Sequence, residues 1–247
     1  MKWTSLGDSV TGTAHRTRNI PCQDAFCFRT FGVTGNWLVI AVADGAGSAL
    51  FSEIGATIVC NEFVQIIEQL EPDIIYSRDH MIALFGRVRK TLEEEAQRRN
   101  INIRELACTV LLAVIGPDSA FFAQIGDGAI VFRQGIDYRV VFWPESEEYV
   151  NVTHFLTDDS FEELVRFEAI KEPIFEVAAF TDGLQRVALD FTVRVAYQAF
   201  FGPLFNELRT ITDPELLIEP FRCFLDSDRV NQRTDDDKTL VFAVRKP

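Results

Sequence analysis

The chain has 247 residues, of which 24 are Lys or Arg and 37 are Asp or Glu, so its formal net charge is −13. Apolar residues make up 47% of the sequence, which is typical of a globular protein and excludes a disordered chain. An acidic chain lacks the cationic face that a polyanion requires, so we expect no nucleic-acid partner. Since no Pro/Gly/Ser-rich linker divides the sequence, we interpret residues 1–247 as one domain.

The sequence shows no targeting or membrane segment. Its longest apolar runs, Trp37–Ala43 and Val110–Ile115, are much shorter than the roughly 18 residues that cross a bilayer. The 5 cysteines are scattered without CxxC spacing, which is typical of buried thiols in a reducing compartment. We therefore expect a monomeric cytoplasmic protein with no membrane partner.

The predicted elements alternate in blocks of strands and helices. Short runs rich in Val, Ile and Phe predict strands, and apolar residues at helical spacing predict helices. In chain order we expect strands Cys27–Phe31 and Trp37–Ala43, helices Ser52–Leu70 and Asp79–Asn100, strands Cys108–Ile115, Ala120–Ile125, Ala129–Arg133, Arg139–Phe142 and Phe175–Thr181, helices from Leu184 to about Leu208 and from Pro214 to about Leu225, and strand Thr239–Val244. Turn residues at Gly116–Asp118 and Gln134–Gly135 favour antiparallel pairing, so the pattern predicts an α+β fold.

Aspartates stand at one end of four predicted strands. Asp44, Asp127 and Asp182 each follow a strand and precede a glycine, and Asp236 comes just before the last strand. Any one Asp-Gly pair alone is best interpreted as a turn. Together, carboxylates on one rim would repel one another unless a cation neutralised them, and their oxygens suit Mg²⁺ or Mn²⁺. If the strand ends converge, the spacing predicts a metal-dependent hydrolytic site.

Short motifs extend this pattern along almost the whole chain. They are Gly12–His15, Pro21–Ala25, Val42–Ser48, Ala107–Thr109, Gln124–Gly128, Thr153–Phe155, Phe180–Gly183 and Asp236–Thr239. In this order they resemble the metal-dependent serine/threonine phosphatases of the protein phosphatase 2C (PPM) family, most closely its short bacterial PphC-like branch. The resemblance implies two packed antiparallel β-sheets flanked by α-helices, a four-layer αββα sandwich.

The resemblance also implies a metal centre with Mn²⁺ or Mg²⁺. Asp44 would bridge two ions and the Gly45 carbonyl would be a further ligand, while Asp182 and Asp236 would each bind one ion or share one. Asp127 would face a third, weaker site. A water or hydroxide bridging the two ions would attack phosphoserine or phosphothreonine in phosphorylated cytosolic proteins.

Residues shortly before Asp24 depart from the family pattern. Asp24 would hold a metal through water, but many members have Glu where this chain has Gln23. Many members also bind the phosphate with an Arg at the position of Asn19. Arg16 and Arg18 lie nearby in the sequence and are candidates for that role, although loop arginines are as often simply solvated.

The sequence also leaves open which residue would act as the general acid. Some family members have a histidine after the first Asp-Gly, where this chain has Ala46, and His15 is a candidate replacement. A histidine that only satisfies buried backbone is an equal alternative. These departures also leave open a pseudophosphatase that binds a phosphoprotein or regulatory partner without turning it over. Residues 143–159 occupy the place of the family's flap, where Tyr149–Asn151 either select substrate or belong to a solvated loop.

Overall fold

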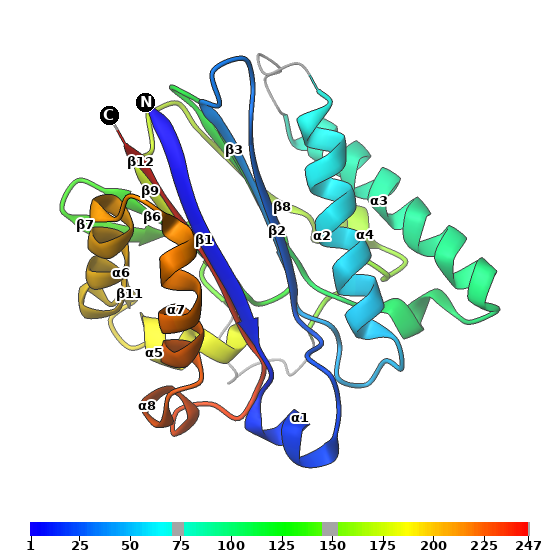
Figure 1. The fold of residues 1–247 in the computed structure, drawn as a ribbon. Helices are drawn as coiled ribbons and strands as arrows, with labels where there is room; N and C mark the ends of the chain where they lie inside the picture. The colour runs from blue at the N-terminus through cyan, green and yellow to red at the C-terminus, as the bar shows by residue number, and fades with distance from the viewer. Residues whose placement is uncertain (71–76, 145–152, 247) are drawn as a thin grey trace.

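Two five-stranded antiparallel sheets pack face to face in the computed structural model, which describes residues 1–70, 77–144 and 153–246 (Figure 1). The first sheet has the order β1 (Lys2–Val10), β12 (Lys238–Lys246), β9 (Glu176–Phe180), β6 (Ala129–Gln134) and β7 (Asp137–Val140). The second has the order β2 (Ala25–Phe31), β3 (Trp37–Ala43), β4 (Val110–Ile115), β5 (Ala120–Ile125) and β8 (Arg166–Ile170). The sheet pair and its antiparallel pairing confirm the predicted α+β sandwich.

The continuous apolar run of β3 is explained by burial on both of its faces. Side chains of a strand alternate between the two faces of the sheet. Leu38 and Ile40 pack in the core between the sheets, whereas Val39 and Ala41 pack in the core beneath the helices of the second sheet. A strand that is covered on both sides has no polar face, so it shows no alternation in its sequence.

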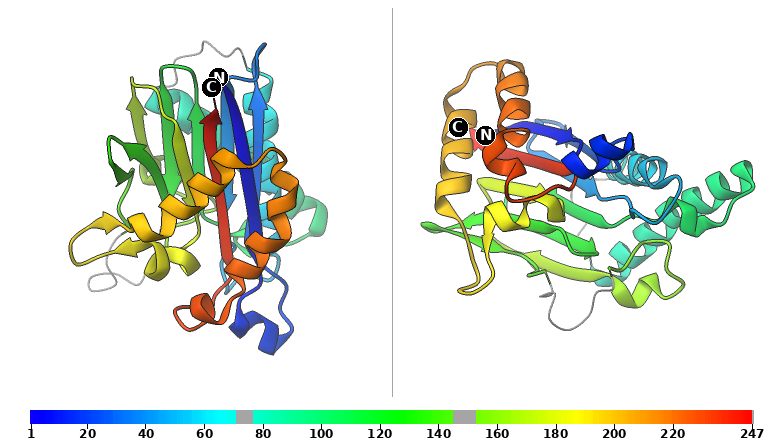
Figure 2. Two further views of the ribbon diagram at one scale, coloured as in Figure 1. Left: turned by 60° about the vertical axis from the view of Figure 1, so that its left-hand side comes forward. Right: turned by 90° about the horizontal axis from the view of Figure 1, so that it is seen from below.

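Helices cover the outer face of each sheet (Figure 2). α2 (Ser52–Glu68) and α3 (Arg78–Arg99) cover the second sheet, and α6 (Gln198–Thr210) and α7 (Ile218–Leu225) cover the first. The shorter elements are α1 (Thr13–Arg18), η1 (Ile103–Leu106), α4 (Phe161–Leu164), η2 (Asp182–Leu184), α5 (Gln185–Ala188), β10 (Leu189–Asp190), β11 (Val195–Ala196), η3 (Pro214–Leu217) and α8 (Asp228–Asn231). Within the described residues, every helix is too short or too polar to cross a bilayer.

The strand register gathers the predicted ligands at one rim of the sandwich. In the first sheet Phe180, at the end of β9, is paired with Leu240 near the start of β12. In the second sheet Ala43, at the end of β3, is paired with Ala25 at the start of β2. Hydrogen bonds from the hydroxyls of Thr181 and Thr239 to Asp24 show that the segments next to these residues leave both sheets at the same end.

The long helix predicted from Leu184 to about Leu208 was wrong in its first half. That stretch contains η2, α5 and the β10–β11 hairpin, and the helix begins only at Gln198. The Asp190 carboxylate accepts hydrogen bonds from the backbone N–H groups of Thr192 and Val193. This local turn competes with the helical hydrogen bonds, and Arg194 then adopts a left-handed φ of 53°. Strands β1 and β8 and helix α1 were not predicted.

Candidate active site

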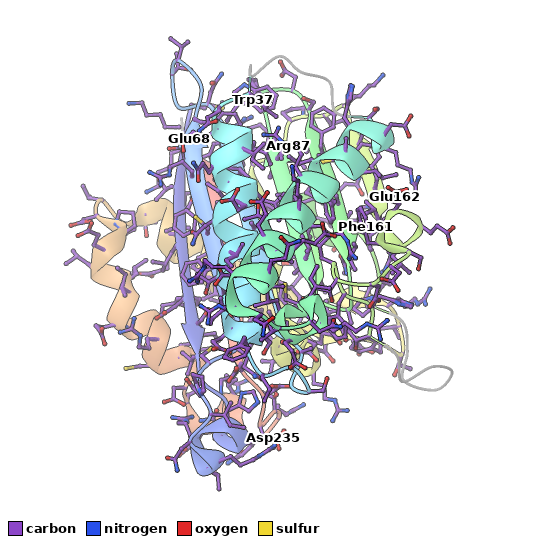
Figure 3. The ribbon with its side chains drawn as sticks, turned by 90° about the vertical axis from the view of Figure 1, so that its right-hand side faces the viewer. Trp37, Glu68, Arg87, Phe161, Glu162 and Asp235 are labelled. Carbon is purple, nitrogen blue, oxygen red and sulfur yellow. The ribbon has the colours of Figure 1, made fainter. Side chains whose placement is uncertain are left out.

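A cavity of about 350 Å³ lies at the rim where the strand ends meet. The candidates from the sequence that line it are His15, Arg18, Asp44, Gly45, Asp127, Asp182 and Asp236. They come from both sheets, since Asp44 follows β3 and Asp182 follows β9. Figure 3 shows Asp235, which also lines the cavity, at the opposite end of the molecule from Trp37, the first residue of β3. The structure thus brings together four aspartates that lie far apart in the sequence.

The carboxyl groups of Asp44 and Asp182 interact directly. Burial raises the pKa of Asp44 well above its ordinary value, and the charges of Asp24 and Asp182 and a hydrogen bond to Asp182 raise it further. The pKa of Asp182 is raised to about 6, chiefly by burial and further by the charges of Asp127 and Asp236. Neighbouring carboxylates therefore disfavour one another's ionised forms, which is the electrostatic condition that a bound cation relieves.

Several buried oxygens at the site lack a hydrogen-bond partner within the described residues. They are Gln23 Oε1, Asp24 Oδ1, Asp127 Oδ1 and Asp182 Oδ1. Buried polar atoms are normally paired with protein, water or an ion, and oxygen ligands suit Mg²⁺ and Mn²⁺. Across residues 1–70, 77–144 and 153–246 the His, Cys, Asp and Glu side chains form no preassembled group of three around a metal position. These oxygen atoms thus have the right chemistry to bind divalent ions, but they are not arranged as the coordination sphere of an ion.

Packing around Gly45 requires a glycine at that position. A Cβ on Gly45 would lie 2.7 Å from the carbonyl oxygen of Gln23 and 2.8 Å from Cβ of Ser52. The Gly45 N–H donates to the same Gln23 carbonyl at 3.1 Å. Just before it, the Asp44 N–H donates to Thr109 Oγ1 at 2.9 Å, and the Thr109 N–H donates to the Asp44 carbonyl at 2.8 Å. These contacts hold the backbone of the Asp44-Gly45 pair in one position.

Asp24 does not line the cavity but lies buried behind it. Its Oδ2 accepts hydrogen bonds from the hydroxyls of Thr181 and Thr239, each at 2.8 Å. Burial and the charge of Asp237 raise the pKa of Asp24 well above its ordinary value, while the two hydroxyls oppose that shift. Because Oδ2 already accepts two hydrogen bonds, Oδ1 is the oxygen that remains for a metal-bound water. The indirect role of Asp24 stays a prediction.

Asp237 is a site residue that the sequence reasoning missed. Its buried carboxylate accepts the backbone N–H groups of Gly12 and Gln23, each at 2.6 Å. His15 Nδ1 also lies 2.9 Å from Asp237 Oδ2, a contact that becomes an ion pair when the imidazole is protonated. The run Asp235–Asp237 was the available signal, but composition alone does not distinguish an inward carboxylate from an outward one.

The two arginine candidates have different surroundings. The Arg16 guanidinium is paired with Asp226, with 2.9 Å between Nη1 and Oδ2, and it does not line the cavity. Arg18 does line the cavity. Thr153 also lines the cavity, and its hydroxyl donates to Asp127 Oδ2 at 2.9 Å. The proposed substrate-selecting residues Tyr149–Asn151 lie outside the described residues.

Comparisons with known proteins agree with this fold. The model of the protein phosphatase 2C family matches residues 11–219. Serine/threonine-protein phosphatase 3 of Escherichia coli (strain K12) is 36% identical over 251 residues, which cover 99% of each chain. The serine/threonine phosphatase Stp1 of Staphylococcus aureus superposes with a TM-score of 0.69 at 14% identity over 100% of this chain and 96% of that one. The S. agalactiae serine/threonine phosphatase superposes with a TM-score of 0.67 at 15% identity over 98% and 99%. The two structures share the fold, and the family model together with the 36% identical relative shows that the chain belongs to the protein phosphatase 2C family of serine/threonine phosphatases.

Proposed function

We propose that the chain hydrolyses phosphoserine and phosphothreonine in phosphorylated cytosolic proteins with two divalent ions, Mn²⁺ or Mg²⁺. Asp44, the Gly45 carbonyl, Asp182 and Asp236 would hold them. The observation that carries this proposal is the convergence of mutually repelling carboxylates, with unpartnered buried oxygens, on one cavity. When bound, such ions neutralise negative charge and lower the pKa of water.

Further residues of the cavity fit supporting roles. Asp127 keeps one carboxylate oxygen without a partner among the described residues, which suits it to a third ion. Asp24 would act through water. Arg18 lines the cavity and is the basic side chain that we assign to the phosphate group, because a guanidinium binds two phosphate oxygens at once.

His15 is the proton donor that we assign to the leaving oxygen. A serine alkoxide is a poor leaving group unless it is protonated, so a positioned acid would accelerate the reaction. The Asp237 carboxylate lies 2.9 Å from His15 Nδ1, close enough to orient the imidazole ring. His15 also lines the cavity in which we propose that the substrate binds, which supports this assignment.

Release of inorganic phosphate from phosphoserine and phosphothreonine peptides tests the proposal. We expect release with added Mn²⁺ and none with EDTA. Asp182→Asn and Asp236→Asn should lower it by about a hundredfold or more, because each removes a charged oxygen ligand. Asp118→Asn, in the exposed turn between β4 and β5, is the matched control and should be unaffected.

Two outcomes would contradict the assignment. Asn has the size of Asp but lacks its charge. Undiminished activity in Asp182→Asn would therefore exclude this metal site. Stable binding of a phosphopeptide with metal present, seen by calorimetry without phosphate release, would instead support the pseudophosphatase alternative.

A further inference from the structure

A second cavity, of about 600 Å³, lies between α6 and α7 on the outer face of the first sheet. α6 packs against β12 and α7 packs against β1, and these two strands are neighbours (Figure 1). The groove between the helices therefore runs over the β1–β12 ladder. Its floor is the cross-strand pair Leu6 and Phe242, which lie opposite each other in the register. We call this cavity the α6–α7 groove.

The walls of the α6–α7 groove are aromatic. Phe200 of α6 and Phe224 of α7 approach each other with ring centroids 5.9 Å apart. Phe221 of α7 packs edge-on against Phe242 of the floor, with centroids 5.2 Å apart. The cavity volume lies within the range of about 300–1,000 Å³ that is typical of small-molecule sites. Phe200 and Phe221 are buried, so the apolar surface is recessed and suits an inserted chain better than a flat surface.

Positive charge gathers at one end of the groove. Arg186 of α5, Arg229 of α8 and Arg233, which follows α8, line it. Arg229 and Arg233 are exposed and make no ion pair within the described part of the chain. One carboxylate, Glu207, also lines the groove, but it lies in the last turn of α6, whereas the arginines come from α5, from α8 and from the segment that follows α8. In a chain with a net charge of −13, this local excess of arginine is a specific feature.

We propose that the α6–α7 groove binds a free single-chain amphipathic anion. Its apolar chain would lie over Leu6 and Phe242, and its anionic head group would bind Arg229 and Arg233. Apolar walls supply most of the binding free energy at such sites, and a few converging polar groups orient the ligand. Guanidinium groups bind carboxylate and phosphate oxygens with paired, charge-assisted hydrogen bonds. This inference goes beyond the proposed phosphatase function and does not depend on it.

Displacement of a fluorescent fatty acid by dodecanoate, with the full chain in metal-free buffer, tests the proposal. We expect one site per chain, with dodecanol binding about tenfold more weakly than dodecanoate because it lacks the charge. Two variants address the two halves of the site. Arg229→Glu/Arg233→Glu reverses the charge at the head-group end, and Ala199→Trp fills the groove from an exposed position on α6. Each should weaken binding by about tenfold or more.

Arg87→Glu is the matched charge control, since Arg87 is exposed on α3, over the other sheet (Figure 3). It should leave dodecanoate binding unchanged. A crystal structure with a brominated dodecanoate would place the bromine in the groove directly and does not depend on any variant folding. Equal affinity for dodecanol and dodecanoate, or unchanged affinity in Ala199→Trp, would overturn the proposal. Binding to anionic phospholipid vesicles without binding to free dodecanoate would also overturn it, because it would indicate a membrane surface instead.

Discussion

Asp237 Oδ2 accepts a hydrogen bond from the backbone N–H of Gln23 at 2.6 Å. The bond joins the start of β12 to the segment before β2, across 214 positions of sequence. Gln23 in turn accepts the N–H of Gly45 through its carbonyl oxygen. A single buried carboxylate therefore connects loops that carry the predicted ligands Asp24, Gly45 and Asp236, and it connects them without lining the cavity itself.

Replacing Asp237 should destabilise the fold more than replacing its neighbour. Asp237→Ala leaves the N–H groups of Gly12 and Gln23 buried without an acceptor, which we expect to lower the free energy of unfolding by about 2–4 kcal/mol. Asp235→Ala removes an exposed carboxylate and should cost less than about 0.5 kcal/mol. Urea denaturation of the two variants is the measurement. Equal losses of stability would contradict the structural role of Asp237.

Two glycine-to-alanine changes should have opposite effects. A Cβ at position 45 would meet Gln23 and Ser52 at 2.7–2.8 Å, so Gly45→Ala should destabilise the protein by about 1–3 kcal/mol. At Gly86, within α3, a Cβ would meet Phe161 Cζ at an ordinary contact distance of 3.7 Å, and Gly86→Ala should stabilise the helix by about 0.5–1 kcal/mol. Thermal denaturation of both proteins checks the pair. A Gly45→Ala protein as stable as the parent would show that the loop can shift away from the new methyl group.

The convergence of the aspartates was a hypothesis that the sequence raised and that the strand order of the fold explains. Runs such as Trp37–Ala43 have unmistakable β composition, and an antiparallel arrangement returns alternate strand ends to one rim. Motif order then linked Asp44, Asp127, Asp182 and Asp236. The strands and the hypothesis of a shared site depend on composition and spacing, whereas the ligand roles came from the family resemblance.

Other features of the site depend on contacts between distant segments and could not be predicted in this way. β1 contains Gly7 and has large apolar residues only at Trp3, Leu6 and Val10, without the alternation of a strand, so its strand character appears only through pairing with β12. The role of Asp237 depends on Gly12 and Gln23, which the chain brings to it only after folding. For the same reason, Arg16 and Arg18 were equal candidates by their position in the sequence. In the fold, Asp226 at the end of α7 pairs with Arg16 and so distinguishes the two.

Without metal, the protein should lose stability as the pH rises. The pKa of Asp182 is raised from 3.8 to about 6 in the fold, and the pKa values of Asp44 and Asp24 are also raised. The native state therefore binds more protons than the unfolded chain between about pH 4 and pH 6, and the free energy of unfolding falls across that window. Melting temperatures measured with EDTA across this range check the direction.

Added Mn²⁺ should reverse this trend. Ions replace protons on the carboxylates, so they should raise the melting temperature more at about pH 7.5 than at about pH 5. Asp182→Asn serves as the comparison, because a neutral amide cannot titrate and should flatten the pH dependence measured in EDTA. A metal-free protein that grows more stable from pH 4 to pH 6 would contradict the electrostatic account of the site.

The hydroxyls that hold Asp24 should affect metal affinity. Thr239→Val removes one of the two hydrogen bonds to Asp24 Oδ2, which makes the carboxylate harder to ionise. We expect Mn²⁺ affinity to fall by about tenfold, the size of effect that is usual for groups that support metal ligands. Thr239→Ser keeps the hydroxyl and should restore the affinity. Calorimetric titration distinguishes these outcomes, and equal affinities in the Val and Ser variants would exclude the role of the hydroxyl.

Replacing Arg18 and replacing Arg16 should have different effects on KM. Arg18 lines the cavity, so Arg18→Ala should raise KM for a phosphopeptide by about tenfold through loss of a charge-assisted contact to phosphate. Arg16 is paired with Asp226 and both side chains are partly exposed, at 43% and 36%, so Arg16→Ala should change stability by less than about 1 kcal/mol and leave KM unaltered. Arg18→Lys keeps the charge but loses the paired geometry of the guanidinium, and it should lie between Ala and the parent. If Arg16→Ala raised KM while Arg18→Ala did not, the phosphate would be bound on the Asp226 side, and the assignment of the two arginines would be reversed.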